Sequence, residues 1–372
     1  MKLTAIVKTL EKAAPPELAE SWDNVGMMAG STSAEVKKAL VCVDLTHAVL
    51  DEAVRAKAGL VITHHPVIFK PLKHVTASAA PLVHASIRRG VALYSMHTNF
   101  DAAPGGTNDA LAEALGLTRI RPLQAARGEG ECKVVAFVPP DDLSRVSEAA
   151  FGAGAGRIGE YFDCAFFAHG IGAFCGGDGA QPTIGERGEH SVAEEVRLEM
   201  VAPRGRAAAV VAAIRAAHSY ETPAVDVYPL ESRPPGCGMG RVGELKRPVT
   251  VRTLIRRAKT ALGVSKLLVA GEPGRAGDER KANLVSTAAV GAGSGKSLVR
   301  DAVAAGASFY LTGEIGHHEA IDAVEAGLTV VAAGHGNSER LAMRRLAEQL
   351  DEALSGVRVS FSEADRDPLR VE

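Results

Sequence analysis

The chain has 372 residues, of which 46% are apolar and 23% are charged, a composition typical of a globular protein with two or three domains. Forty-two basic residues against 44 acidic residues leave a net charge of −2, which excludes a strongly basic nucleic-acid-binding protein and a long acidic tail. Aromatic residues make up only 4% of the chain, which argues against a stacking platform for single-stranded nucleic acid.

The first twenty residues, MKLTAIVKTLEKAAPPELAE, carry scattered charges and no long apolar run, so no signal peptide is expected. No later stretch approaches the roughly 20 apolar residues that span a bilayer. The five cysteines form no CxxC motif. We therefore expect a cytoplasmic protein with reduced thiols, and neither a membrane nor a nucleic acid as its partner.

Short apolar runs alternate with helical patterns in both outer parts of the chain. In the N-terminal part, the predicted strands are 40–43, 60–63 and 91–95, and the predicted helices are 47–57 and 81–89. The C-terminal third repeats this pattern, with predicted strands at 284–290, 309–311 and 328–332 and a long helix that ends near residue 354. This alternation predicts an α/β fold, a layered core with mixed sheets.

The middle of the chain has a different order of elements. Predicted strands and helices follow one another as βαββαβ, the order of an inserted ferredoxin-like domain. Segments 127–131 and 231–240 are rich in Gly, Pro and charge, as linkers often are. We therefore predict a core formed by residues 1–128 and 241–372 and interrupted by an insert of residues 129–240. The strands of the insert are expected at 132–138, 161–168, 195–201 and 224–230, and its helices at 141–151 and 204–217.

Histidines and carboxylates follow three of the predicted strands. His64 and His65 end the strand 60–63 and precede Pro66, where the chain can turn both imidazoles into one cavity. His97 and Asp101 follow the next strand. Each of these residues alone is more often structural than functional.

A third group, His335 and Glu339, follows the strand 328–332. These two residues are four positions apart and share one face of a helical turn. Taken alone, they are more simply a surface ion pair. Open α/β sheets place their sites at the carboxyl ends of strands, so the three groups together favour a metal site.

The segment Gly291 to Ser297, GAGSGKS, follows a predicted strand and resembles a phosphate-binding loop. That loop needs a glycine five residues before its Gly-Lys-Ser, and Val290 occupies this position. We therefore expect a glycine-rich turn that permits close packing. Nucleotide hydrolysis through this turn stays open as a weaker alternative.

Several longer motifs resemble those of the Nif-three-like family, whose members are commonly labelled GTP cyclohydrolase 1 type 2 homologs. The resemblance extends from the first residues to beyond Glu339 and includes the insert. The motifs are SWDNVG (21–26), ITHHPVIFKPL (62–72), HTNFDAAPGG (97–106), GAGRIG (154–159), YETPA (220–224), TGEIGHHEA (312–320) and GHGNSER (334–340).

The resemblance implies a site for two divalent cations. His64, Asp101 and Glu339 would bind one cation, and His65, His335 and Glu339 the other, so that Glu339 bridges the pair. Imidazole and carboxylate ligands without thiolate suit Zn, Mn, Fe, Co or Ni. His97, Glu314 and His317, with His318 beside it, are candidates for proton transfer or for orienting the ligands.

Two classes of function follow from this site. The first is a metal-dependent hydrolase, in which metal-activated water attacks an anionic or nucleotide-like substrate. The second is a non-catalytic metal-binding or regulatory protein whose insert drives assembly or binds a partner. The resemblance also implies a homo-oligomer, a hexameric ring.

Overall fold

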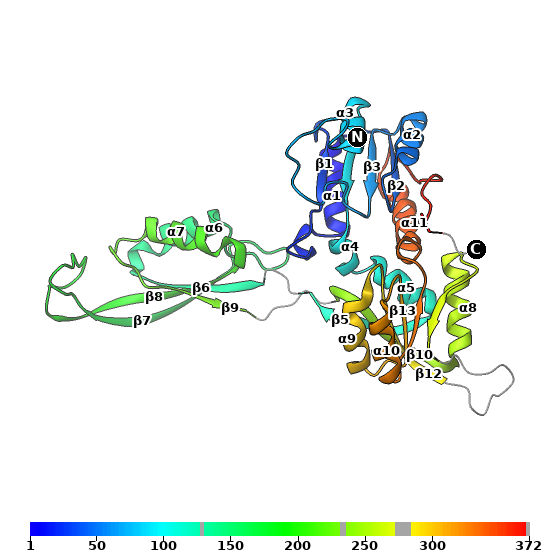
Figure 1. Cartoon of the computed structure of the whole chain (residues 1–372). Helices are drawn as coiled ribbons and strands as arrows, with labels where there is room; N and C mark the ends of the chain where they lie inside the picture. Colours follow the sequence, from blue (N-terminus) through cyan, green and yellow to red (C-terminus); the bar gives the residue numbers. More distant parts are fainter. Residues whose placement is uncertain (127–129, 231–235, 272–283, 370–372) are drawn as a thin grey trace. The chain divides into compact units, whose positions relative to one another are not determined.

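The computed structural model describes residues 1–126, 130–230, 236–271 and 284–369, and the chain divides into two compact units (Figure 1). Unit 1 contains Met1–Ala126 and Pro234–Glu372, and unit 2 contains Arg127–Arg233. In the described residues, no helix combines the length and the hydrophobicity that a bilayer-spanning segment requires.

The first sheet of unit 1 has five strands, four of them parallel. Strands in the middle of a parallel sheet are buried on both faces and read as continuous apolar runs, as LVIT in β3 does, where all four residues are buried. Its order is β1 (Gly26–Ala29), β4 (Ala92–Ser95), β3 (Leu60–Thr63), β2 (Lys38–Cys42) and β15 (Arg358–Phe361), with β1 antiparallel to β4.

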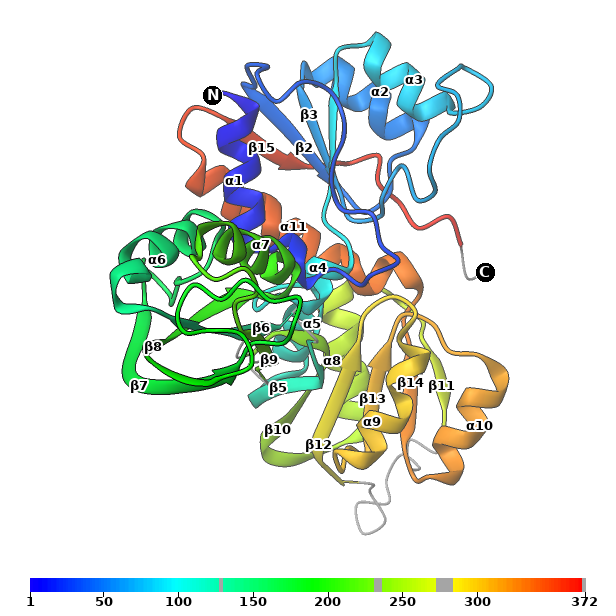
Figure 2. The same ribbon diagram turned by 90° about the vertical axis from the view of Figure 1, so that its left-hand side faces the viewer.

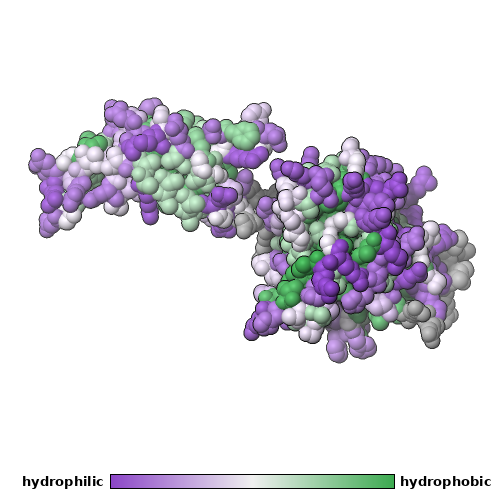
Figure 3. Space-filling model, turned by 90° about the horizontal axis from the view of Figure 1, so that it is seen from above, coloured by the Kyte–Doolittle hydropathy of each residue, from purple (hydrophilic) through white to green (hydrophobic). Residues whose placement is uncertain are grey.

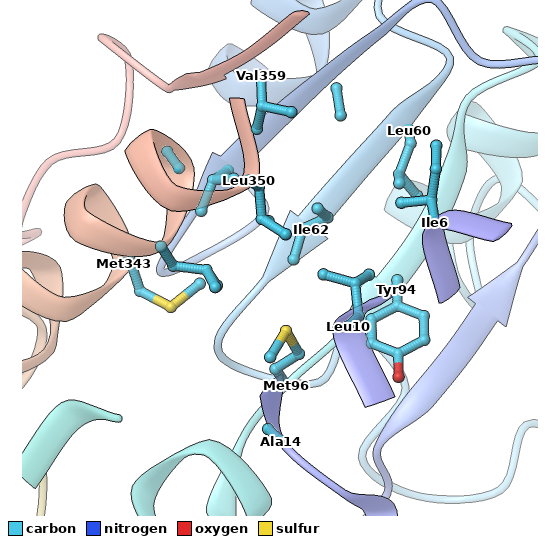
Figure 4. Packing of buried hydrophobic residues seen from close by; sticks show 14 of the residues in the cluster. Ile6, Leu10, Ala14, Leu60, Ile62, Tyr94, Met96, Met343, Leu350 and Val359 are labelled. Carbon is cyan, nitrogen blue, oxygen red and sulfur yellow. The ribbon is translucent and has the colours of Figure 1, made fainter. Parts of the chain in front are cut away.

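Two pairs of helices cover the faces of this sheet. Side chains alternate between the faces of a strand, so Leu60 and Ile62 of β3 pack beneath α1 (Leu3–Ala13) and α11 (His335–Ala353), as Figure 4 shows. Val61, between them, faces the opposite layer with residues of α2 (His47–Ala56) and α3 (Pro81–Arg88).

The second sheet of unit 1 has six strands, of which β12, β13 and β14 are parallel. Helices α5 (Thr107–Leu115) and α8 (Val251–Leu262) pack on one face, and α9 (Val299–Ala304) and α10 (His317–Glu325) on the other (Figure 2). The strand order is β11 (Leu268–Ala270), β14 (Thr329–Ala332), β13 (Phe309–Thr312), β12 (Leu284–Gly291), β10 (Gly238–Thr250) and β5 (Leu117–Ala125).

Helix α11 connects the two sheets. It begins directly after β14 of the second sheet, contacts α5 and α8, and packs its apolar residues Met343 and Leu346 into the core of the first sheet. A short buried helix, α4 (Thr98–Ala102), follows β4 of the first sheet. The residues at the start of α11 and along α4 therefore lie where the two halves of unit 1 meet.

The described part of unit 2 has one antiparallel sheet and two α-helices. The elements follow one another as strand, helix, strand, strand, helix, strand, and both helices share an apolar core with one face of the sheet. Pale green residues gather over this helical layer in Figure 3, where α7 has the sequence AAAVVAAIRAA. The sheet order is β7 (Ala165–Cys175), β8 (His190–Pro203), β6 (Glu131–Val138) and β9 (Val225–Pro229), with α6 (Leu143–Gly152) and α7 (Ala207–Ala217).

The predicted α/β class with mixed sheets is confirmed, and the linker predicted at 231–240 is wrong at its C-terminal end. Gly238 already pairs with Ala125, because β10 begins there and continues the ladder with β5. Likewise Glu131, at the end of the first predicted linker, already pairs with Pro203 in the sheet of unit 2. Residues 127–129 and 231–235 of these predicted linkers, including the predicted boundary at 128/129, lie outside the described residues.

Candidate metal centre

Two histidines extend from the end of β3 into the interior of unit 1. The His64 and His65 amides continue the ladder of the sheet by donating to the carbonyls of Cys42 and Val43. The Thr63 hydroxyl donates to the His65 carbonyl at 2.8 Å, where the chain bends after β3. The two rings lie only 5.1 Å apart, with His64 fully buried.

Helix α11 places a carboxylate against both of these rings. Glu339 is 2% exposed, and its Oε2 lies 3.3 Å from His65 Nε2 while its Oε1 lies 3.6 Å from His64 Nε2. One helical turn earlier, His335 Nε2 lies 3.2 Å from the same Oε1. The predicted i,i+4 pair therefore shares one helix face, and Glu339 contacts three imidazoles.

Asp101 reaches the cluster from α4. Its Oδ1 lies 3.6 Å from His64 Nε2 and accepts a hydrogen bond from the Thr107 hydroxyl. Asn108 fixes the backbone here, because its amide nitrogen donates to the Asp101 carbonyl at 2.9 Å. The His97 ring lies 5.3 Å from that of His64.

Each of the four imidazoles is held through its Nδ1 atom. His64 Nδ1 contacts the Met96 carbonyl at 2.8 Å, and the other three Nδ1 atoms contact carboxylates. Metal-binding histidines are held in this way, because the outer partner fixes both the tautomer and the ring orientation. The carboxylate pairs are His65–Asp44 and His97–Asp23, each at 2.8 Å, and His335–Glu314 at 3.3 Å.

The glycine-rich turn after β12 closes tightly over the cluster. Gly293 has a φ of +58°, and a Cβ atom built there would overlap Glu339 Oε1 and lie 3.2 Å from His335 Nε2. Its amide donates to the Ser338 hydroxyl at 2.9 Å. The predicted role of this segment as a closely packed turn is confirmed.

The carboxylates and the imidazoles of the cluster stabilise one another's charged forms. Burial favours the neutral form of Glu339, yet the surrounding imidazoles hold the pKa of its carboxyl well below the ordinary value. Burial also disfavours a charged His65, but Asp44 and Glu339 outweigh it and raise the pKa of His65 to about 10. The Glu339 carboxylate raises the pKa of His335 to about 9. Without a cation, protons on the imidazoles therefore balance the buried carboxylate.

The donor atoms fit divalent cations. Among the described residues, His64 Nε2, His65 Nε2 and Glu339 Oε2 are buried atoms that have no hydrogen-bond partner. Unsatisfied buried polar atoms are costly, and a cation would satisfy them. Two groups of three residues each bring their possible ligand atoms within 4.8 Å of one another. The first group is His64, His65 and His97, and the second is His65, His335 and Glu339.

The structure brings together seven of the eight site residues that the sequence predicts, all except His317. His97 and Glu314 line the cluster, whereas His317 and its neighbour His318 are exposed at the start of α10 and pack against each other. The roles of Asp44 and Asp23 behind the imidazoles were missed. Asp44 comes two residues after β2, which pairs with β3. An acidic residue just beyond a strand that neighbours β3 is the signal that would have indicated a partner for His65.

Comparison with known proteins identifies the family of this chain. The family model for Duf34/NIF3 (NGG1p interacting factor 3) matches residues 1–368. A Bacillus subtilis protein named GTP cyclohydrolase 1 type 2 homolog is 36% identical over 369 residues, which cover 98% of this chain and 96% of that protein. A Mycobacterium bovis protein of the same name is 39% identical over 345 residues, covering 91% and 88% of the two chains.

Solved structures show the same architecture. A Bacillus cereus protein related to NIF3 superposes with a TM-score of 0.70 at 33% identity, over 100% of this chain and 99% of that one. The Staphylococcus aureus protein SA1388 superposes with a TM-score of 0.78 at 25% identity and the same coverage. The family match spans nearly every residue, and the resemblance drawn from the motifs is confirmed: this chain belongs to the Duf34/NIF3 family.

Proposed function

We propose that this protein binds two divalent cations and is a metal-dependent hydrolase. His64, Asp101 and Glu339 would hold one cation, and His65, His335 and Glu339 the other. The observation that carries the proposal is the Glu339 carboxylate, whose Oε2 faces His65 and whose Oε1 faces His64 and His335. A carboxylate in this position could serve as a ligand to both cations.

The ligand atoms limit the choice of cation. The proposed ligands are three imidazoles and two carboxylates without a thiolate, which suits Zn, Mn, Fe, Co or Ni better than Cu(I). The raised pKa values of His65 and His335 imply that cations displace protons when they bind.

Hydrolysis requires a group that can move protons near the reacting atoms. Divalent cations supply a Lewis acid that lowers the pKa of water toward about 7. His97 is placed to receive a proton, because Asp23 holds the orientation of its ring through Nδ1 at 2.8 Å. Burial opposes the charged form of Asp23, but hydrogen bonds from His97 and Thr98 outweigh it and lower the pKa of Asp23 to about 2.

The name of the relatives suggests the substrate. The Bacillus subtilis and Mycobacterium bovis proteins are named GTP cyclohydrolase 1 type 2 homologs, so a nucleotide-like anion is the first substrate to test. Two divalent cations with two carboxylates and neutral imidazoles leave net positive charge, which would attract such an anion.

A non-catalytic metal-binding or regulatory oligomer is the second candidate. The complete burial of His64 and the 2% exposure of Glu339 favour it, because a structural metal site is closed whereas a catalytic one keeps an open position. In either case we propose a cytoplasmic homo-oligomer, a hexamer, whose mass can be measured by light scattering.

The test is GTP turnover by protein of measured metal content, read as formate release. The Glu339→Gln variant should lose both bound metal and turnover, because one neutral amide replaces the bridging carboxylate. Glu348→Gln, on an exposed position of the same helix, is the matched control and should retain both. Two bound metals without turnover would favour the non-catalytic candidate, and two metals retained by Glu339→Gln would contradict the bridge.

A further inference from the structure

A large cavity opens beside the cluster in unit 1. It has a volume of about 980 Å³ and lies at the carboxyl ends of the parallel strands β12, β13 and β14, where open α/β sheets bind their ligands. His335 and Glu314 form part of its wall, so a ligand in the cavity reaches the edge of the proposed metal centre. A cavity of this size holds a whole small molecule.

The glycine-rich turn contributes a lysine to this cavity. Ser294 and Lys296 line it, and the turn that carries them is fixed by the Tyr310 hydroxyl, which donates to the Gly295 carbonyl at 2.7 Å. On its other side, the same turn packs through Gly293 against Glu339. One rigid segment therefore links the cluster to the cavity wall.

A second lysine comes from α8. Lys259, near the end of this helix, is half-buried and also lines the cavity. The wall also carries a third lysine, Lys266, and three carboxylates, those of Glu314, Glu319 and Asp367. Glu314 pairs with His335, and Asp367 accepts a hydrogen bond from the Leu369 amide. No ion pair in the described part of the chain involves Lys259 or Lys296, so both ammonium groups can contact an anion.

We propose that this cavity binds an organic phosphate, with its phosphate groups on Lys296 and Lys259 and its reacting end beside His335. This inference rests on the proposed function and adds the substrate class and its orientation. Lysine binds phosphate as a compact charge with three donors. The organic part would lie against the apolar wall formed by Leu267, Leu268 and Ile315, and Lys296 would determine specificity for phosphorylated over unphosphorylated ligands.

The experiment measures binding of inorganic pyrophosphate to the metal-loaded full chain by titration calorimetry. The double variant Lys259→Gln/Lys296→Gln should bind pyrophosphate at least tenfold more weakly than the wild type. The double variant Lys259→Arg/Lys296→Arg should remain within about threefold, because it keeps both charges. The matched control Lys38→Gln/Lys246→Gln removes two exposed charges outside the cavity and should bind within twofold of the wild type.

Metal content is measured on the same samples, so that the two proposals fail separately. If the Gln double variant binds pyrophosphate as tightly as the wild type does, the lysine site is overturned. The hydrolase proposal is unaffected by that result if the protein retains both metals and GTP turnover. If the Gln double variant loses pyrophosphate binding while the metal-loaded wild type binds pyrophosphate but turns over no GTP, the lysine site stands and the hydrolase proposal falls. A loss of equal size in the control would show a general charge effect and would also overturn the lysine site.

Discussion

At the scale of single residues, the carboxylates behind the imidazoles decide how the cluster is organised. Asp44 contacts Nδ1 of His65, and Asp23 contacts Nδ1 of His97. These contacts leave the Nε2 atoms of both rings directed toward the cluster. The sequence predicted the inner residues, because a histidine at a strand end and an i,i+4 pair on a helix have local spacing that can be recognised. Asp44 could not be assigned in this way, since its contact depends on how β2 and β3 align.

We expect Asp44→Ala to weaken metal binding about 10- to 100-fold, because His65 loses the partner that fixes its tautomer and orientation. Competition with a chelator of known affinity measures the effect. Asp51→Ala is the control, because Asp51 is similarly exposed and pairs with Arg89 away from the cluster. Equal metal affinities in the two variants would contradict a role for Asp44.

Gly293 provides a second test at this scale. Gly293→Ala places a methyl group against Glu339 Oε1 and should lower the metal content per chain. Gly306→Ala is matched, because Gly306 also has a positive φ, of +77°, but open space around its Cα. It should cost about 1 kcal/mol of stability through backbone strain alone and leave the metal content unchanged. Elemental analysis combined with thermal denaturation separates the two effects.

At the scale of elements, a buried arginine joins α4 and α5 to β10. Arg241 is 1% exposed, and its guanidinium donates to both carboxylate oxygens of Asp109, at 2.7 and 3.0 Å, and to the Ala103 carbonyl at 3.2 Å. It thus holds the segment that directly follows Asp101.

Arg241→Met should lower the free energy of unfolding by about 3–5 kcal/mol, because it leaves the Asp109 carboxylate without its buried partner. Arg119→Met removes an exposed pair with Glu244 and should cost at most about 1 kcal/mol. Urea denaturation measures both. Similar losses in the two variants would show that Arg241 does not act through its buried contacts.

Glu52 of α2 holds the segment after β15 through hydrogen bonds. Its carboxylate accepts hydrogen bonds from the Ser362 hydroxyl and the amides of Glu363 and Ala364. Burial opposes the charged form, but these hydrogen bonds outweigh it and lower the pKa of Glu52 below its ordinary value of 4.5.

A carboxyl with a lowered pKa stabilises the fold above its unfolded-state value and loses this contribution as the pH falls. We therefore expect the wild type to lose stability below pH 4.5 more steeply than Glu52→Gln, which carries no titrating group at this position. Thermal denaturation at pH 3 to 7 measures the difference. Parallel stability curves would rule out this contribution of Glu52.

The same scale shows which elements the sequence can predict. The strands β2, β3, β13 and β14 and the second half of β12 are almost entirely buried, so they read as apolar runs. The predicted positions of these five strands agree with the structure within about two residues. By contrast, β5 contains Pro and two Arg residues, β10 contains Pro, Gly and several charges, and the register between these two strands is irregular. Their pairing is set by partners far along the chain, which a local pattern does not contain.

At the scale of the whole molecule, unit 2 interrupts a hairpin of unit 1. Ala125 of β5 and Gly238 of β10 are paired neighbours, so the chain leaves and re-enters unit 1 at adjacent points. The two strands could be joined by a short loop without changing their register. Unit 2 also has its own apolar core, as an independently folding domain requires.

We expect that replacing Arg127–Arg233 by a short Gly-Ser linker leaves unit 1 folded, with unchanged metal content and a Tm within a few degrees of the full chain. Circular dichroism and elemental analysis measure both properties. Residues 127–233 expressed alone should also fold. An unfolded core after this replacement would contradict the domain division that we propose.

The separation of the cluster residues along the chain affects how the protein is made. His64, His65 and Asp101 leave the ribosome long before His335 and Glu339, and domains begin to fold from the N-terminal side during synthesis. The cluster can close only when α11 has emerged and packed against the first sheet. A nascent chain that has not yet reached Glu339 therefore exposes imidazoles without their shared carboxylate, and the proposed binding of cations would follow only after α11 is complete.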